Sequence, residues 1–378
     1  MSDAPNPALI ERFFAPCPRG LEPIVAQECA DCGASDLKEI PGGVLFAADW
    51  AAAKRINLES RSASRVLWQA ASGPARTEQQ VYELALALPW DTWFSVNNTI
   101  RVATTGLNAT VRSLDFVSLR IKDAVCDRFR EVMDARPSVN TQRPDIRIQC
   151  VLTDRDCTLY LDMSGEALFK RGWREAGEAP LRENLAAGIL KLAGWTPGTP
   201  LFDPMCGSGT FLIEAAQMAA GVPPGALHGF AFEKFLHRDA SRPVIEKREP
   251  VPTVFAGSDI DGELVATART NAWNAGLAED AIRFDVKDAR DVEPPCEAPG
   301  IVLMNPPYEE RIGFSYTRDA TEFFDAFAAT MKRRFKGWTL YVLTTDMQLQ
   351  SKMRLKPERR VVLFNGPLEC RLYRFDLR

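Results

Sequence analysis

The hydrophobic positions of the first 165 residues follow the periods of both strands and helices. Apolar and polar residues alternate over 146–163 around a polar run at 153–156, so the sequence predicts a β-hairpin. A long helix is predicted where apolar residues share one helical face, at Leu114, Val117, Ile121, Val125, Phe129 and Val132. Thr77-Glu78-Gln79-Gln80 has the spacing of a capping box ahead of another helix. With strand-like runs at 43–46 and 99–103, these patterns predict α+β modules.

The rest of the chain alternates short apolar runs with helical patterns. Runs at 199–202, 254–258, 282–286 and 301–304 have the length of strands. A doubly wound α/β sheet has this alternation, and it binds ligands beyond the carboxyl ends of its strands. The predicted fold class is therefore α/β, a Rossmann-like domain preceded by α+β modules. The segment 219–254 is rich in Pro and Gly, and it is predicted to be an insertion near the ligand edge. Its aromatic residues could cover the substrate pocket, but packing onto the adjacent helix is favoured.

A Gly-rich turn follows the first of these runs and precedes a helix. Gly207 and Gly209 allow the backbone to approach a ligand closely, and Asp203 can accept from a ligand ammonium group. The Gly-Lys-Ser/Thr ending of a triphosphate loop is absent. S-adenosylmethionine, which has an ammonium group and no phosphate, therefore fits better than ATP. The predicted cofactor contacts here are Asp203, Pro204, Met205, Cys206, Gly207, Gly209 and Thr210.

Two later strand ends carry further carboxylates. Asp259, with Ile260 beside it, could hold two ribose hydroxyls or cap the following helix, and Asp261 is the stronger candidate for the cap. Asp288 could accept from an adenine amine, and the Ala289 amide could donate to the ring. Each pair of residues means little alone. Their order along the chain predicts a single cofactor site.

The tetrapeptide Asn305-Pro306-Pro307-Tyr308 ends the last apolar run. An exocyclic amine delocalises its lone pair into its ring, and it is a poor nucleophile until acceptors are aimed at its hydrogens. The Asn305 side-chain oxygen and the Pro306 carbonyl can be those acceptors, because a Pro-Pro segment has restricted backbone angles. Tyr308 can stack on the base. These three residues are the predicted catalytic residues, and Asn305 also belongs to the predicted cofactor contacts; the alternative is a proline-stiffened surface turn.

Composition indicates a multidomain enzyme. The 378 residues, 46% of them hydrophobic, are enough for two or three domains with real cores. No apolar run reaches the ~18 residues that span a bilayer, and the first residues lack a signal peptide's pattern, so a cytoplasmic protein without a membrane partner is predicted. The nine cysteines are scattered, and Cys29-Ala30-Asp31-Cys32 lacks the second pair of a zinc site. No metal is therefore expected.

Together these motifs resemble the class I S-adenosylmethionine-dependent methyltransferases, and among them the amino-methyltransferases with Asn-Pro-Pro-Tyr. Stretches that resemble the bacterial THUMP-domain ribosomal RNA guanine methyltransferases are 168–174, 179–186 and 365–373. The resemblance implies methylation of a guanine N2 amine in 23S ribosomal RNA, free or in a precursor large-subunit particle. The domains it implies are a ferredoxin-like module over 1–65, a THUMP RNA-binding domain over 66–165 and a Rossmann-like methyltransferase domain over 166–378.

The charge distribution bears on the RNA partner. The net charge of −4 is unfavourable for binding phosphates. From Met331 onward, however, twelve Lys and Arg residues face four Asp and Glu residues, a local charge of +8 (12 − 4), which predicts either an RNA-binding surface or a solvated charged face. Arg171, Arg174 and Arg311 are predicted to lie near the reacting nucleotide.

Two features depart from this family. Glu309 stands where Gly often follows the tetrapeptide, which predicts a stiffer loop or a more acidic pocket. From the length of the chain we also expect the second methyltransferase module of some relatives, and its activity, to be absent. The alternatives left open are a DNA adenine or protein glutamine methyltransferase, a transfer-RNA guanine methyltransferase and a non-catalytic RNA-binding assembly factor. The α+β region disfavours the DNA and protein methyltransferases, and the intact motifs disfavour the assembly factor. A transfer-RNA enzyme shares both parts, and only the C-terminal family resemblance separates it.

Overall fold

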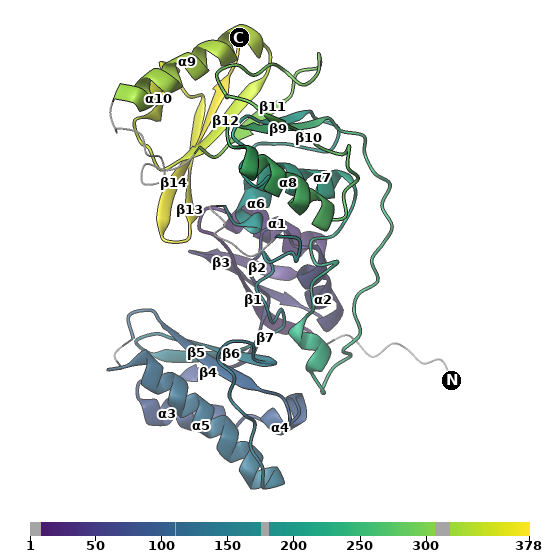
Figure 1. The fold of residues 1–378 in the computed structure, drawn as a ribbon. Helices are drawn as coiled ribbons and strands as arrows, with labels where there is room; N and C mark the ends of the chain where they lie inside the picture. Colours follow the sequence, from purple (N-terminus) through teal and green to yellow (C-terminus); the bar gives the residue numbers. More distant parts are fainter. Residues whose placement is uncertain (1–8, 110, 175–180, 307–317) are drawn as a thin grey trace. The chain divides into compact units, whose positions relative to one another are not determined.

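The computed structural model describes residues 9–109, 111–174, 181–306 and 318–378 (Figure 1). The chain forms two compact units, and it passes between them several times. Unit 1 consists of Met1–Cys17, Val25–Leu168 and His228–Val244. Unit 2 consists of Pro18–Ile24, Phe169–Leu227 and Ile245–Arg378.

Unit 1 is built on one seven-stranded sheet with the order β2-β3-β1-β4-β7-β6-β5. Its strands are β1 (Glu11–Pro16), β2 (Ser35–Ile40), β3 (Gly43–Ala48), β4 (Leu67–Pro74), β5 (Ile100–Gly106), β6 (Ile146–Leu152) and β7 (Asp156–Asp162). The predicted hairpin is β6–β7, and every second residue of β6 is buried. Strand β4 pairs antiparallel with both β1 and β7, so the two predicted α+β modules share one continuous sheet.

Helices cover this sheet. Those wholly or mostly in unit 1 are α1 (Glu22–Asp31), α2 (Trp50–Glu59), α3 (Glu78–Leu86), α4 (Trp90–Trp93), α5 (Leu114–Met133) and the 3₁₀ helix η1 (Ala231–Lys234). Helices α3 and α5 pack on each other and on β4 and β5 (Figure 1). Thr77 caps α3 by accepting from the Gln80 amide at 3.2 Å, and the apolar face of α5 is buried, as the sequence predicts.

The segment His228–Val244 comes from the middle of the methyltransferase sequence but packs within unit 1. The Leu236 amide donates to the Trp93 carbonyl at 2.9 Å, and His237 stacks on Trp68 with ring centroids 4.8 Å apart. The buried Lys54 ammonium pairs with Asp239 at 2.7 Å. The described partners of His228–Val244 thus belong to unit 1, and the place of the insertion near the ligand edge stays a prediction. Periodicity within the segment does not reveal these partners, which lie about 140 to 185 residues earlier in the sequence.

Unit 2 is built on a second seven-stranded sheet with the order β10-β9-β8-β11-β12-β14-β13. Its strands are β8 (Leu201–Asp203), β9 (Phe255–Asp259), β10 (Arg283–Val286), β11 (Ile301–Met304), β12 (Thr339–Thr344), β13 (Arg359–Asn365) and β14 (Leu368–Asp376). The first five strands in the order are parallel, and β14 and β13 add an antiparallel hairpin at one edge. This confirms the predicted doubly wound fold.

The helices of unit 2 are α6 (Glu183–Leu192), α7 (Thr210–Ala219), α8 (Gly262–Asn274), α9 (Arg318–Arg334) and α10 (Leu349–Met353). A core forms where α9 and α10 meet the sheet, and Phe202 stacks on Phe335 there with centroids 5.6 Å apart. Helix α7 packs on β8 and β9. In the described residues no helix has the length and apolarity to cross a membrane.

Candidate functional site

Two neighbouring strand ends bring the predicted site residues to one edge of the unit 2 sheet. Strand β8 pairs in parallel with β11, and Leu201 and Phe202 lie opposite Ile301 and Val302. Asp203 at the end of β8 and Asn305 just after β11 therefore lie at the same edge. The chain continues from β8 to β9 and β10 on one side, and β11 and β12 lie on the other side. This is the switch point at which doubly wound sheets bind ligands.

The Gly-rich turn after β8 is held by backbone hydrogen bonds. The Cys206 amide donates to the Ser258 carbonyl at 2.9 Å, and the Gly207 amide donates to Asp259 Oδ2 at 2.9 Å. The Gly209 amide closes the turn on the Cys206 carbonyl at 2.8 Å. The turn is thus fastened to the end of β9, and the carboxylate of Asp259 is part of that fastening.

The two glycines of the turn are required for different reasons. Both have positive φ, +51° at Gly207 and +83° at Gly209, which favours glycine. A Cβ at Gly209 would lie 3.2 Å from the Ala268 Cβ and 3.3 Å from the Ile213 Cδ1, so this glycine permits close packing. A Cβ at Gly207 would meet no atom of the described residues within 4 Å. The Gly207 backbone therefore faces open space, as a ligand-binding turn requires.

Asp203 is a buried carboxylate, only 2% exposed. Its Oδ1 accepts from the Met205 amide at 3.1 Å, and no Lys or Arg of the described residues pairs with it. Burial raises the pKa of Asp203 well above its ordinary value, and the nearby Asp259 charge adds to this effect. A ligand ammonium group would supply the missing positive charge. Asp203 thus fits the amino-acid end of S-adenosylmethionine.

The acidic strand end of β9 has a second role. Asp259 Oδ1 accepts from the Asp261 amide at 3.0 Å, and Asp261 accepts from the Glu263 amide at 2.8 Å. Asp261 is therefore the N-cap of α8, as the sequence predicts. Each Asp259 oxygen keeps a second lone pair for a ligand hydroxyl. The side chain of Ile260 is 70% exposed at this edge, which leaves an apolar surface for a ring.

The carboxylate after β10 has a partner within the chain, and the predicted adenine contacts of Asp288 and Ala289 stay predictions. The Asp288 carboxylate pairs with the Arg290 guanidinium at 2.6 Å, and this hydrogen bond lowers the pKa of Asp288. The acceptor oxygens of Asp288 therefore already have a donor. The next residue, Ala289, is buried. In the part of the chain that the structure describes, no group of three or more His, Cys, Asp or Glu residues could hold a metal ion.

The catalytic tetrapeptide is described in part. Asn305 and Pro306 follow the fully buried strand β11, and Pro306 is itself buried. Pro307, Tyr308 and Arg311 lie outside the described residues. The predicted stacking role of Tyr308 and the RNA contact of Arg311 remain predictions.

The structure does not place Arg171 and Arg174 as RNA-binding residues are usually placed. Arg171 is 2% exposed and pairs with the fully buried Glu214 at 3.1 Å. Arg174 donates to Glu183, Ser208 and Thr210, two of which belong to the Gly-rich turn. A phosphate-binding side chain needs exposure, so these placements favour structural roles within unit 2. Both residues were predicted near the reacting nucleotide, and sequence alone does not show burial.

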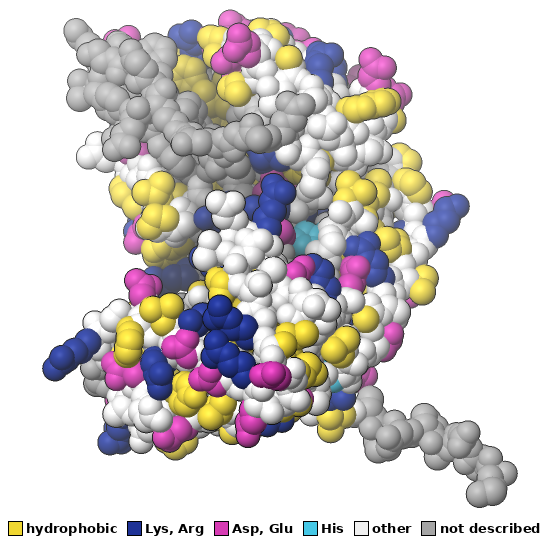
Figure 2. Space-filling model, turned by 60° about the horizontal axis from the view of Figure 1, so that its bottom comes forward, with side chains coloured by type: hydrophobic (Ala, Val, Ile, Leu, Met, Phe, Trp, Pro, Cys, Tyr) yellow, Lys and Arg dark blue, Asp and Glu magenta, His cyan; other side chains and the backbone are white. Residues whose placement is uncertain are grey.

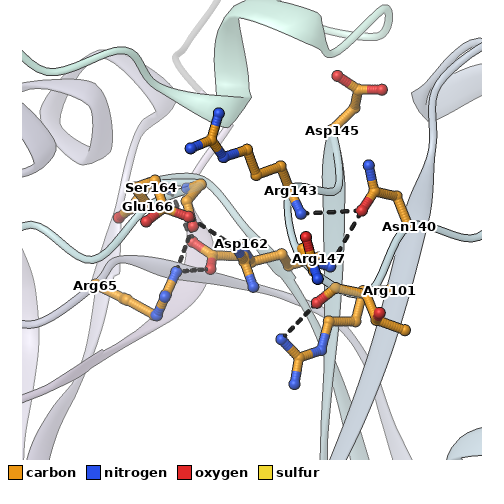
Figure 3. Close-up of polar contacts among 12 residues, drawn as sticks. Arg65, Arg101, Asn140, Arg143, Asp145, Arg147, Asp162, Ser164 and Glu166 are labelled. Atoms are coloured by element: carbon orange, nitrogen blue, oxygen red, sulfur yellow. Dashed lines mark hydrogen bonds and ion pairs between the residues drawn. The ribbon is translucent and has the colours of Figure 1, made fainter.

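A group of arginines that the sequence analysis missed lies on the unit 1 sheet (Figure 3). Arg101 of β5 and Arg147 of β6 are paired neighbours on parallel strands, so both side chains emerge on the same face. Arg143 belongs to the loop before β6, and its amide donates to the Asn140 side chain at 3.0 Å. Arg101 donates to the Thr141 carbonyl of the same loop at 3.0 Å. Finding this group from sequence would have required the strand register.

The three arginines Arg101, Arg143 and Arg147 are only partly paired with carboxylates. Arg147 pairs with Glu166 at 2.9 Å, and its buried Nε has no acceptor among the described residues. The side chains of Arg101 and Arg143 contact no carboxylate of the described residues, and both residues are exposed. Nearby, the buried Asp162 pairs with Arg65 and accepts from the Ser164 amide at 2.9 Å (Figure 3). The arginine group therefore has positive charge available for an anionic partner.

Basic side chains gather in the lower part of the face drawn in Figure 2, among acidic and neutral ones. Several basic residues of the C-terminal segment pair with carboxylates: Arg334 with Glu293, Lys352 with Asp346, Arg354 with Asp325, Arg371 with Glu369, Arg374 with Asp376 and Arg378 with Glu358. Arg359 and Arg360 lie exposed on the edge strand β13. The predicted excess of positive charge is thus partly neutralised locally.

The doubly wound sheet, its Gly-rich turn and the Asn-Pro segment at the switch point define the class, a Rossmann-like methyltransferase that follows an α+β region. The chain belongs to the family of the RMKL-like methyltransferase domain, which matches residues 171–374. The THUMP domain matches residues 75–162, and the RlmL ferredoxin-like domain matches residues 12–67. The family resemblance seen in the sequence is confirmed.

Similar proteins agree with this assignment. The ribosomal RNA large subunit methyltransferase K/L of Shewanella oneidensis is 39% identical over 371 residues, 95% of this chain and 52% of the relative. The protein of that name from Psychromonas ingrahamii is 40% identical over 97% of this chain and 50% of its own. The chain spans about half the length of the curated relatives it matches. SMU.472, described as a methyltransferase and crystallised with SAH, superposes with a TM-score of 0.82 at 28% identity, covering 98% of each chain.

Proposed function

We propose that this chain methylates the exocyclic N2 amine of a guanine in 23S ribosomal RNA. The methyl donor is S-adenosylmethionine, as the sequence predicts and as the SAH complex of the similar SMU.472 structure supports. The observation that carries the proposal is the common sheet edge of Asp203 and Asn305, on the adjacent parallel strands β8 and β11. A donor site and an amine acceptor site therefore meet at the switch point.

Each residue of the proposed cofactor site has a specific role in binding. Asp203 accepts from the ammonium group, and the Gly207 backbone leaves room beside it. Asp259 accepts from ribose hydroxyls, and the exposed Ile260 side chain covers the adenine. When bound, S-adenosylmethionine supplies an electrophilic methyl group on a positively charged sulfur.

Asn305 and Pro306 prepare the amine. The Asn305 side-chain oxygen and the Pro306 carbonyl accept from the two amine hydrogens, which localises the nitrogen lone pair toward the methyl carbon. The nitrogen–carbon bond forms as the sulfur–carbon bond breaks, and the amine proton then passes to water. No general base is required, since the methylated nitrogen is acidic before it loses this proton. The guanine has to leave its stack to reach this edge.

The RNA partner is proposed from charge and from family. Unit 1 contains the THUMP match, the exposed Arg101 of β5 and the exposed Arg143 of a hydrogen-bonded loop. Phosphate contacts from such residues position RNA without reading its sequence. The relatives from Shewanella and Psychromonas are named for the ribosomal large subunit, which supports 23S RNA over transfer RNA as the substrate of this chain.

The variant Asn305→Ala tests the mechanism. Removal of one preorganised acceptor should lower kcat by about 10² or more, whereas the dissociation constant for S-adenosylhomocysteine should stay close to wild type. Asn274→Ala is the control, because Asn274 is exposed at the end of α8. A kcat of Asn305→Ala equal to that of the control would exclude this role for Asn305.

A further inference from the structure

Arg174 makes three hydrogen bonds with one guanidinium group. Its Nε donates to Glu183 Oε1 at 2.7 Å, its Nη1 to Ser208 Oγ at 2.8 Å and its Nη2 to Thr210 Oγ1 at 2.7 Å. Ser208 and Thr210 flank Gly209, the N-cap of α7. The side chain of Arg174 therefore connects the first residue of α6 with the residues on both sides of Gly209.

The partners of Arg174 have little freedom of their own. Thr210 is buried, and the Glu183 carboxylate is 5% exposed and opens helix α6. On the other side of the turn, the buried Asn271 of α8 donates to the Ser208 carbonyl at 3.1 Å. Backbone hydrogen bonds hold Cys206, Gly207 and Gly209, so Arg174 holds the side chains that the backbone bonds leave free.

We infer that Arg174 is a positioning residue that fixes the Gly-rich turn in its cofactor-binding conformation. Gly207 and Gly209 have positive φ and are conformationally permissive, so the turn would sample other conformations without side-chain restraints. A turn that is already ordered loses less entropy when a ligand binds. The inference rests on the proposed cofactor site at this turn. It also replaces the RNA contact that the sequence suggested for Arg174.

The role requires a guanidinium group. Its nitrogens are coplanar and point in fixed directions, so three acceptors in different places are reached at once. A lysine ammonium at this position would still neutralise the buried Glu183, but it is a single point on a flexible stem. Arg174→Lys should therefore keep the stability of unit 2 and lose the restraint on Ser208 and Thr210.

Calorimetric binding of S-adenosylhomocysteine tests the inference without using activity. Arg174→Lys should bind about tenfold more weakly than wild type, the factor associated with lost hydrogen bonds to a charged group, at a near wild-type melting temperature. In turnover assays, KM for S-adenosylmethionine should rise by a similar factor, while KM for RNA and kcat at saturation stay unchanged. Arg182→Ala is the matched control, since Arg182 is exposed and stacks on Phe169 instead of contacting the turn.

A double variant tests the same role without an unpaired Glu183 charge that could disturb folding. Arg174→Ala leaves that carboxylate buried without its partner, and the added change Glu183→Gln removes the charge. The double variant should fold and should still bind S-adenosylhomocysteine about tenfold or more weakly. Wild-type affinity in both folded variants, Arg174→Lys and the double variant, would overturn the inference.

Binding measurements on a Gly207 variant distinguish a wrong role for Arg174 from a wrong location of the cofactor site. Gly207→Val places a branched side chain in the open space beside the Gly207 backbone. If Gly207→Val abolishes binding while the Arg174 variants bind normally, the site stands and the positioning role falls. If Gly207→Val also binds S-adenosylhomocysteine like wild type, the turn is not the cofactor site, and both proposals fall.

Discussion

Replacement of Arg171 by methionine should destabilise unit 2 rather than weaken RNA binding. The Arg171 and Glu214 side chains are 2% and 0% exposed, and their Nε–Oε1 distance is 3.1 Å. Methionine has a similarly unbranched side chain, but it removes the Arg171 guanidinium from the buried Glu214 carboxylate. Breaking such a pair costs about 3–5 kcal/mol, which lowers the melting temperature of a domain of this size by roughly 10 °C. Further replacement of Glu214 by glutamine removes the buried charge and should recover more than half of this loss.

The assay is a double-mutant cycle on Arg171→Met, Glu214→Gln and the double variant, measured by urea unfolding with a probe in unit 2. RNA affinity is measured on the same samples by fluorescence anisotropy below the melting temperature. A double variant that is more stable than Arg171→Met, with RNA affinity unchanged throughout, is the expected outcome. Wild-type stability of Arg171→Met together with a large loss of RNA affinity would refute the reasoning and restore the RNA contact.

Three further predictions concern separate parts of the fold. Gly209→Ala should lose about 1–3 kcal/mol of stability, because its Cβ is crowded and its φ is positive. Gly207→Ala should lose only about 1 kcal/mol of stability but bind S-adenosylhomocysteine more weakly. Thermal melts measure the change in stability, and calorimetry measures the change in binding. Burial, helped by the Arg238 charge, lowers the pKa of His237 from 6.5 to about 4. The unfolded chain therefore binds the proton more readily than the folded chain, so the free energy of unfolding should fall as pH drops from 6.5 to about 4. The fall should be ~1–2 kcal/mol after allowance for partial exposure, and His237→Phe should remove this part of the pH dependence of stability. Arg143→Ala should reduce the salt dependence of RNA binding by about one unit of slope, whereas Gln142→Ala in the same loop should not; equal slopes would exclude a phosphate contact.

The secondary structure that depends on local periodicity was predicted correctly from the sequence. The hairpin β6–β7, the helix α5 with its buried face and the Asp261 cap of α8 all appear where the pattern indicates them. The Gly-rich turn was also found, because its glycines and its position between a strand and a helix are local features.

What the sequence did not predict depends on contacts between distant residues. Arg171 and Arg174 have partners 9 to 43 residues away, and only these partners show that both side chains are hydrogen-bonded within unit 2. The pairing of Arg101 with Arg147 depends on strand register, which no short pattern specifies. The segment His228–Val244 likewise finds its partners, such as Trp68 and Trp93, far back in the chain.

The most direct test of the proposed function identifies the methylated nucleoside. The purified protein is incubated with labelled S-adenosylmethionine and, separately, with ribosomal RNA, transfer RNA, DNA and protein from cells that lack its gene. Nucleosides from each labelled RNA are then identified by mass spectrometry, with Asn305→Ala as the inactive control. We expect N2-methylguanosine in 23S ribosomal RNA. Label in transfer RNA or DNA alone, or a 23S product other than N2-methylguanosine, would contradict the proposal.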